Sequence, residues 1–212
     1  MNVLAVIAHP DDEALGCGGT LAKLADAGHT TTVLLPVRRC DPRGHANWLE
    51  LASAFEKSCE LLGASSVVLE ELLDETRAEA DVHLLHDAIA PHVERADLVL
   101  THWTGDVNQV HRGVARAVEI ATRPFRRRRN VSLFEIPTST DQGFGGGAAF
   151  NPSEYVLLDE SHARRKCDAI ALYGSEMAPG RTPDDVERQL RRRGAEIGAR
   201  FAEAFVVARR FA

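Results

Sequence analysis

The first twenty residues constrain the fold of this chain more than any other stretch of its sequence. Residues 2–8 form an almost unbroken apolar run, partly β-branched, which is typical of a strand buried in a parallel sheet. The run ends abruptly at the ionisable sequence of residues 9–13, and the glycine-rich residues 16–19 lead into a helix-like stretch. Open α/β sheets place their functional sites at the carboxyl ends of the strands. A site is therefore expected where this first strand ends.

The cluster at residues 9–13 (His-Pro-Asp-Asp-Glu) has the residue types that bind a divalent metal. A neutral imidazole and carboxylates are ordinary zinc ligands, and adjacent carboxylates repel one another unless a cation or hydrogen-bond donors hold them. Pro10 stiffens the turn that would aim them. A helix N-terminus capped by Asp11 or Asp12, with Glu13 favoured by the helix dipole, would explain one or two of the acids. It does not explain the His-Pro pair, so the metal-binding interpretation is favoured.

Apolar runs of strand length alternate with segments of helical periodicity, which favours a parallel sheet with right-handed crossovers. The chain has 212 residues, enough for one α/β domain but not for two. The predicted fold class is α/β: a single domain over residues 1–212, a Rossmann-like three-layer αβα sandwich with a mainly parallel sheet. Further strands are expected at residues 30–35, 66–69, 97–101, 131–136 and 155–158, and helices at residues 45–62, 82–90, 112–122, 160–173 and 184–194.

Three segments between these elements are interpreted from local composition. Residues 36–44 are expected to form a polar loop on the same edge of the sheet as the first cluster, with Arg38, Arg39 and Arg43 facing either substrate or solvent. The acidic residues 70–81 are interpreted as a solvated loop or frayed turn without function. The helix at 82–90 is expected to end or kink at Pro91.

A second group of polar residues follows the strand expected at residues 97–101, again at a carboxyl end. Its members are His102, Asp106, Asn108 and His111. This edge of the sheet should also carry His9. A catalytic zinc site needs three protein ligands and an open position for water, and His111, at the start of a helix, can supply the third ligand. His102 is the other candidate, although a histidine at a strand end is more often a surface residue.

The motif AHPDDEALGCGGTLAKL of residues 8–24 resembles the signature of zinc-dependent deacetylases related to N-acetylglucosaminyl-phosphatidylinositol de-N-acetylase, the LmbE-like (PIG-L) family. In that family the His and the second Asp of the motif bind zinc, the first Asp is the general base, and a distant His completes the metal site. The resemblance implies that His9, Asp12 and His111 hold Zn²⁺ and that Asp11 is the catalytic base. Such a nitrogen and oxygen site does not strongly exclude Fe²⁺ or Co²⁺.

The chain departs from the family near the third ligand. The family often has the pattern DxNxDHR there, and Asp106, Asn108, His111 and Arg112 match it. Val110 replaces the Asp that usually precedes the metal-binding His and is thought to support a neighbouring acid or that His. The sequence therefore leaves two candidates for the general acid. Asp11 could return the proton that it took from water, or His102 or another group could donate one.

The resemblance implies a metal-dependent hydrolase that removes an N-acetyl group from an amino sugar or amino-sugar-containing metabolite, with a metal-activated water attacking the amide. Its partner would be a small N-acetylated molecule. The hydroxyl group of Ser139, after the strand expected at residues 131–136, could hydrogen-bond sugar hydroxyls. The candidate substrate-binding residues are Arg38, His102, Asp106, Asn108 and Ser139.

Two other functions are compatible with parts of the sequence. Val110 favours a weakly active or inactive relative that binds a sugar or nucleotide sugar without hydrolysis. The strand, glycine and helix order of the first residues is also typical of dinucleotide-binding oxidoreductases. The glycines at residues 16–19, however, come too late after the strand and lack the G-x-G-x-x-G spacing, which argues against the second alternative.

Charge and composition exclude further classes. A net charge of −6 argues against a general nucleic-acid binder, and the lack of an apolar run of about 20 residues argues against a membrane span. The sequence starts directly with the strand and shows no signal segment, so a cytoplasmic location is expected. The sequence leaves the oligomeric state open, a homo-oligomer included.

No C-x-x-C pair is present, so reduced thiols are expected at Cys17, Cys40, Cys59 and Cys167.

Overall fold

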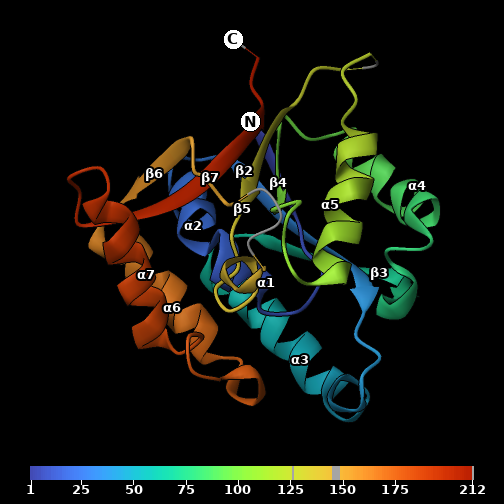
Figure 1. Cartoon of the computed structure of the whole chain (residues 1–212), viewed down its shortest axis with the longest axis horizontal. Helices are drawn as coiled ribbons and strands as arrows, with labels where there is room; N and C mark the ends of the chain where they lie inside the picture. Colours follow the sequence, from blue (N-terminus) through green and yellow to red (C-terminus); the bar gives the residue numbers. More distant parts are fainter. Residues whose placement is uncertain (126, 145–148, 212) are drawn as a thin grey trace.

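The computed structural model describes residues 1–125, 127–144 and 149–211, without the side chains of residues 43–45 and 70–72. The strands are β1 (Asn2–Val6), β2 (Thr30–Arg38), β3 (Ser65–Asp74), β4 (Leu98–His102), β5 (Asn130–Phe134), β6 (Glu154–Leu158) and β7 (Phe201–Arg209). They form a seven-stranded sheet in the order β3-β2-β1-β4-β5-β7-β6 (Figure 1). Strand β7 pairs antiparallel with β5 and β6, and the other neighbouring strands in this order pair parallel. The predicted α/β class with a mainly parallel sheet is confirmed.

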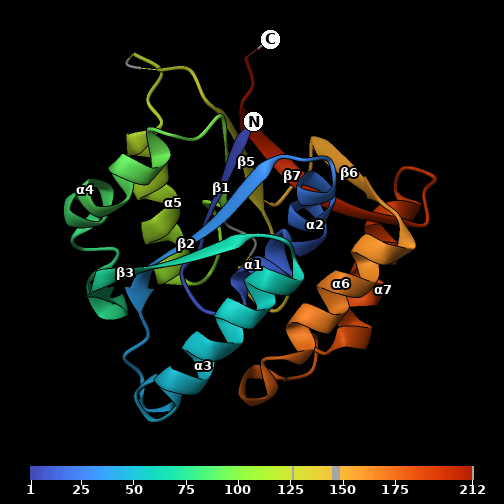
Figure 2. The same ribbon diagram turned by 180° about the vertical axis from the view of Figure 1, so that it is seen from behind.

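The helices lie on both faces of the sheet. They are α1 (Asp12–Gly16), α2 (Gly18–Asp26), α3 (Pro42–Leu61), α4 (Val82–Val93), α5 (Gln109–Ala121), α6 (Glu160–Ala171) and α7 (Pro183–Ala195). The two views in Figures 1 and 2 show α4 and α5 on one side of the sheet and α3, α6 and α7 on the other. This arrangement is the three-layer αβα sandwich that the sequence predicts. None of the described helices is both long and apolar enough to cross a lipid bilayer.

Strand β1 has a hydrophobic core on each of its faces. In this strand and the two residues after it, residues 3, 5 and 7 pack with α1, α2, α3 and α6, whereas residues 4, 6 and 8 pack under α4 and α5. All six side chains are buried. A strand covered on both faces has no solvent side, which is why residues 2–8 read as a continuous apolar run rather than as an alternating one.

Two predicted strand boundaries are wrong because pairing extends the strands past their local breakers, and of the two outcomes expected at Pro91 the structure excludes the end of the helix. Strand β2 continues through Pro36, next to which the pairing with β3 is irregular, and ends at Arg38. Residues 70–81 are not wholly a loop, because β3 runs to Asp74 and a short 3₁₀ helix follows over Glu75–Arg77. Helix α4 continues through Pro91 to Val93.

A buried ion pair joins the C-terminal part of the fold to the segment that follows β1. The Nζ atom of Lys166 on α6 lies 2.5 Å from Oε1 of Glu203 on β7 and donates to the carbonyl oxygen of Leu15 over 2.8 Å. The Glu203 carboxylate also accepts hydrogen bonds from the backbone N–H groups of Gly19 and Thr20, at 2.9 and 2.7 Å. Both charges therefore have partners, which a buried pair requires. The four cysteines are free thiols, as predicted.

Candidate metal centre

The candidate site lies where the strand order of the parallel sheet reverses. The chain moves outward from β1 to β2 and β3 on one side, and from β4 to β5 on the other. Strands β1 and β4 are parallel neighbours, so the loops after their carboxyl ends lie side by side. His9 and Asp12 follow β1, and His111 lies in the first turn of α5, which follows β4. A crevice at such a switch point is the usual ligand site of an open α/β sheet.

Three side chains from these two loops converge on one point. His9, Asp12 and His111 offer ligand atoms that all lie within 4.8 Å of one another. Nδ1 of His9 is 3.2 Å from Nε2 of His111, and each of these nitrogens is 3.5 Å from a carboxylate oxygen of Asp12. Two imidazole nitrogens and a carboxylate are a donor set that fits Zn²⁺, and also Fe²⁺ or Co²⁺. The structure thus brings together the three residues for which metal binding was predicted.

The second ring nitrogen of each histidine faces a carboxylate. Nδ1 of His111 lies 3.2 Å from Oδ1 of Asp106, and Nε2 of His9 lies 3.4 Å from Oε2 of Glu75. The other oxygen of Glu75 accepts hydrogen bonds from the backbone N–H groups of Cys40 and Asp41, at 2.6 and 2.9 Å. Carboxylates in this position fix the orientation of a metal-binding imidazole and raise its basicity. The acidic segment that carries Glu75 was interpreted from the sequence as having no function, so this residue was missed.

Asp12 is held as a carboxylate by its surroundings. Its Oδ2 atom accepts hydrogen bonds from the backbone N–H groups of Ala8 and His9, at 3.2 and 2.7 Å. Burial by itself raises the pKa of Asp12, but the charge of His111 and the hydrogen bonds with His111 and His9 outweigh burial and lower that pKa well below its ordinary range. Metal ligands must be deprotonated, and Asp12 meets that condition.

Asp11 has a strained backbone that a buried network holds in place. Its φ of 114° and ψ of −26° lie in the left-handed region, which is unfavourable for a residue other than glycine. The backbone N–H of Asp11 donates to Oε2 of Glu13 over 3.2 Å, and Oε1 of Glu13 accepts from the hydroxyl groups of Ser58 and Tyr173, at 2.5 and 2.6 Å. The network fixes the turn that aims the Asp11 side chain.

The carboxyl group of Asp11 faces the same space as the three converging ligand atoms. It lies 3.3 Å from Nη1 of Arg181, which comes from the loop before α7. Burial and the neighbouring Asp12 raise the pKa of Asp11, and Arg181 opposes this shift. A carboxyl group with a raised pKa is suited to take up and return a proton near neutral pH.

His102 lies behind the ligand set rather than in the cavity. Its ring stacks on that of His111, with centroids 4.1 Å apart and an interplanar angle of 13°, and its Nε2 accepts from the N–H of Ala8 over 3.0 Å. Burial and the charge of His111 lower the pKa of His102 to about 3, so the ring is neutral. The predicted substrate contact of His102 is therefore not what the structure shows, because the ring is fully buried and supports His111.

Of the other three substrate contacts predicted in this region, two support His111 and one lines the cavity. Asp106 accepts hydrogen bonds from the hydroxyl groups of Ser139 and Thr140, at 2.5 and 2.6 Å, while facing His111. Asp106 and Ser139 therefore hold the third ligand in place, and neither lines the cavity described below. Asn108 caps α5 through its side-chain oxygen, which accepts from the N–H of Val110 over 2.8 Å, and it does line the cavity.

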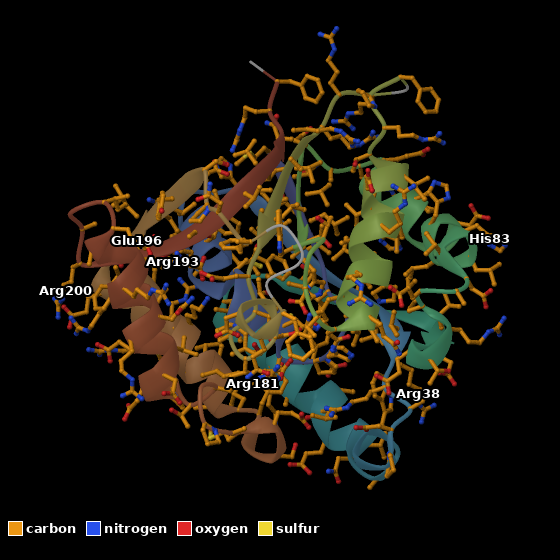
Figure 3. The ribbon with its side chains drawn as sticks, in the orientation of Figure 1. Arg38, His83, Arg181, Arg193, Glu196 and Arg200 are labelled. Carbon is orange, nitrogen blue, oxygen red and sulfur yellow. The ribbon has the colours of Figure 1, made fainter. Side chains whose placement is uncertain are left out.

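The extension of β2 changes which arginine reaches the site. Arg38 ends β2 opposite Asp74, is exposed, and places its guanidinium group 5.4 Å from the ring centroid of Trp48. Figure 3 shows it beside α3, well away from Arg181. Arg39 lines the cavity in its place. The side chain of Arg43 lies outside the described residues.

An open cavity of about 380 Å³ contains the ligand atoms, which is enough space for a small molecule. Its lining is polar apart from one alanine. The lining residues are His9, Asp11, Asp12, Arg39, Asp41, Glu75, Asn108, His111, Glu176, Ala178 and Arg181.

Comparisons with known proteins identify the family of this chain and solved structures that share its fold. The family model described as PIG-L, GlcNAc-PI de-N-acetylase, matches residues 4–122, more than half of the chain. No curated protein sequence gives a significant match.

Solved structures of several enzymes share the fold, all at low sequence identity. The zinc-inhibited form of teicoplanin deacetylase Orf2 is 16% identical with a TM-score of 0.77, over 98% of this chain and 99% of that chain. N,N'-diacetylchitobiose deacetylase from Pyrococcus horikoshii is 18% identical with a TM-score of 0.67, over 97% of this chain and 83% of that chain. GalB, the 4-carboxy-2-hydroxymuconate hydratase from Pseudomonas putida KT2440, is 17% identical with a TM-score of 0.75, over 100% of this chain and 97% of that chain.

Proposed function

This chain belongs to the GlcNAc-PI de-N-acetylase (PIG-L) family, and we propose that it is a metal-dependent hydrolase that removes an N-acetyl group from an amino sugar or an amino-sugar-containing metabolite. The observation that carries the proposal is the convergence of His9, Asp12 and His111 in a polar cavity, beside the carboxyl group of Asp11. The deacetylases among the structural neighbours, which act on teicoplanin and diacetylchitobiose, support the reaction type.

His9, Asp12 and His111 would hold the metal ion, with zinc as the proposed metal. A divalent ion bound there would lower the pKa of a coordinated water toward ~7 and polarise the acetyl carbonyl. Asp11 would accept the proton of the attacking water as the new C–O bond forms, and would return it to the amine as the amide C–N bond then breaks. Arg181, beside Asp11, would hold that carboxylate in position through both transfers.

A second candidate is a relative that binds a sugar without hydrolysing it, and Val110 favours it. The Val110 side chain is buried in the core under α5 and offers no acid. Asp106 and His102 are both occupied in supporting His111. Proton donation to the amine would then fall to Asp11 alone, and hydrolysis depends on whether one carboxyl group can serve both steps.

The test is a screen of N-acetylated amino sugars and their conjugates with zinc-loaded protein, read as acetate release. The proposal expects acetate from at least one substrate, and none from that substrate with the His111→Ala variant. Sugar binding without acetate release would favour the second candidate. Protein that takes up no divalent ion and is inactive with every added metal would contradict both the site and the reaction.

A further inference from the structure

The guanidinium group of Arg181 presents unused hydrogen-bond donors to the cavity. Arg181 lies in the loop between α6 and α7, its side chain is 23% exposed, and it lines the cavity beside Asp11. Its Nε donates to the hydroxyl oxygen of Thr138 over 2.6 Å, and its Nη1 donates to Oδ2 of Asp11 over 3.3 Å. No described residue accepts a hydrogen bond from Nη2, and this atom is not closed off from solvent. Nη2 can therefore donate to a ligand in the cavity.

Two strained residues hold this guanidinium group. Among the described residues, only Asp11 and Thr138 are non-glycine residues with a positive φ, at 114° and 64°. A β-branched residue is a clear outlier in this region, and such strain persists at functional sites where the surrounding structure fixes it. A methyl group on Gly180 would overlap Cγ2 of Thr138, so the loop that carries Arg181 packs directly on this residue. Arg181 is thus held in one orientation at the cavity wall.

A divalent ion would make the surroundings of Asp11 favourable for a negative oxygen. Over the whole lining, five carboxylates would face two guanidinium groups and the two charges of the ion, so the charges nearly cancel. The other three carboxylates face Arg39 or His9. Asp11 and Asp12 would face Arg181 and the ion, with both histidine ligands neutral as metal binding requires. This leaves an excess of about one positive charge beside Asp11.

The proposed reaction places a negative oxygen at this point. When the water oxygen bonds to the acetyl carbon, its proton goes to Asp11 and the electron pair of the C=O bond moves onto the carbonyl oxygen. Nη1 and Nη2 are bonded to the same carbon of Arg181, so a group that reaches the Asp11 carboxyl lies close to Nη2 as well. A hydrogen bond from a guanidinium group would strengthen as charge develops on the carbonyl oxygen. The acetate product carries both oxygens, the one from water and the one from the carbonyl.

We propose that Arg181 is a catalytic residue that donates a hydrogen bond from Nη2 to an oxygen of the acetyl group, and that it holds the acetate product by the same donor. This role adds to its contact with Asp11. The inference rests on the proposed function for the reaction, and the binding of acetate tests it without turnover.

The binding test measures the affinity of the zinc-loaded protein for acetate by NMR titration. Arg181→Met is expected to raise the dissociation constant of acetate by about 10–100-fold, because a hydrogen bond between charged groups is lost. To remove any effect exerted through Asp11, the same change is made in Asp11→Asn protein, where a loss of at least about fivefold should remain. Arg181→Lys in that background should restore only part of the affinity, because lysine lacks the fork of donors.

Kinetics with an accepted substrate give a second readout. Arg181→Met should lower kcat by about 10²–10³-fold with a smaller change in KM, as the loss of a donor to a developing oxyanion does. It should also lower the residual kcat of Asp11→Asn protein, which a residue that acts only through Asp11 would not do.

Arg200→Met serves as the control and should bind acetate like the wild type. Arg200 is exposed and pairs with Glu160, and Figure 3 shows it on the outer side of the molecule, away from Arg181. All comparisons are made between folded proteins of equal zinc content. If Arg181→Met does not fold, the comparison of Arg181→Lys with its parent decides in the same way.

Three results would overturn the proposal. They are a wild type that does not bind acetate, an Arg181→Met change that leaves the acetate affinity of Asp11→Asn protein unaltered, and full affinity in Arg181→Lys, which would mean that charge alone is responsible. Acetate release separates the two proposals. Acetate affinity that depends on Arg181 in a protein that deacetylates no substrate would uphold the donor and reject the reaction. An active enzyme whose acetate affinity does not depend on Arg181 would do the reverse.

Discussion

At the scale of single residues, each histidine at the candidate metal position is backed by a carboxylate from a different part of the chain. Asp106 precedes α5 and faces His111, whereas Glu75 follows β3 and faces His9. The two carboxylates fix which nitrogen of each ring points at the metal position. The ligand geometry is therefore set by residues that do not touch the metal position themselves.

The role of Glu75 can be tested by Glu75→Gln. Loss of the carboxylate should weaken the affinity for zinc by about 10–100-fold, because His9 loses the acceptor that orients its ring. Competition with a chelating dye measures the affinity. Glu50→Gln, an exposed position on α3, serves as the control and should bind zinc like the wild type. An unchanged affinity in Glu75→Gln would show that Glu75 does not orient His9.

The role of Asp11 can be tested by Asp11→Asn. Asparagine tolerates the left-handed backbone, so this change removes the proton acceptor with little effect on the turn. We expect turnover to fall by about 10²–10⁴-fold while the metal content stays at the wild-type level. Steady-state kinetics and metal analysis of the same preparation measure the two quantities. Turnover close to that of the wild type would remove Asp11 from the role of general base.

The sequence could predict the residues that touch the proposed metal, but not those behind them. His9, Asp11 and Asp12 follow an unmistakable buried strand, and His111 follows another strand at the same edge of the sheet. The role of Glu75 could not be predicted, because it depends on where β3 ends. The sequence also does not show which of the neighbouring acidic residues the following turn would place beside His9. Glu176 lies about a hundred residues further along the chain, and only the packing of α6 brings it to the cavity.

At the scale of elements, α5 and the segment after β3 approach each other through a glycine. A methyl group on Gly113 would lie 2.7 Å from the carbonyl oxygen of Ala78 and 2.8 Å from its carbonyl carbon. Real side chains do not come so close to backbone atoms, so only glycine permits this contact. The contact matters for the site because the segment that ends at Ala78 begins at Glu75.

The variant Gly113→Ala tests this coupling. We expect it to lower the free energy of unfolding by about 1–3 kcal/mol, as overpacking of a buried contact does, and to weaken zinc binding because Glu75 moves away from His9. Urea unfolding and zinc titration measure the two effects. Gly143→Ala, where no atom of the described residues lies within 4 Å of the added methyl group, should change neither. Wild-type stability together with wild-type zinc affinity in Gly113→Ala would refute the coupling.

The ion pair between α6 and β7 makes a second prediction about elements. Lys166→Met should destabilise the fold by about 3–5 kcal/mol, because it leaves the buried Glu203 charge unpaired. Adding Glu203→Gln should restore much of the loss, since the neutral amide needs no counter-charge. Urea unfolding of the single and double variants gives the comparison. A double variant less stable than Lys166→Met would mean that the hydrogen bonds of Glu203 to α2, and not its charge, dominate.

Element types could be read from the sequence better than element ends. The strand and helix order was predictable because apolar periodicity is a local property of the chain. The ends of β2 and β3 were not predictable, because the two strands pair beyond the local breakers. This pairing carries β2 through Pro36 to Arg38 and carries β3 to Asp74. That prolongation has functional consequences, because it turns Arg38 outward and places Arg39 and Glu75 at the cavity.

At the scale of the whole molecule, the fold brings two loops together where the strand order reverses. The loops after β1 and β4 are separated by about a hundred residues of chain, and the parallel pairing of their strands places them side by side. The α/β class and the edge that carries the site follow from the sequence because both depend on the order of elements. The composition of the cavity wall does not, since Glu176, Ala178 and Arg181 come from the segment between α6 and α7, far along the chain from the other lining residues.

The central claim is that His9, Asp12 and His111 together hold one divalent ion. Elemental analysis of the purified protein after reconstitution with zinc measures this most directly, with the His111→Ala variant beside it. The account predicts one ion per chain in the wild type and almost none in the variant, with both proteins folded by circular dichroism. A folded wild type that retains no zinc, iron or cobalt, or a variant that keeps its full complement, would contradict it.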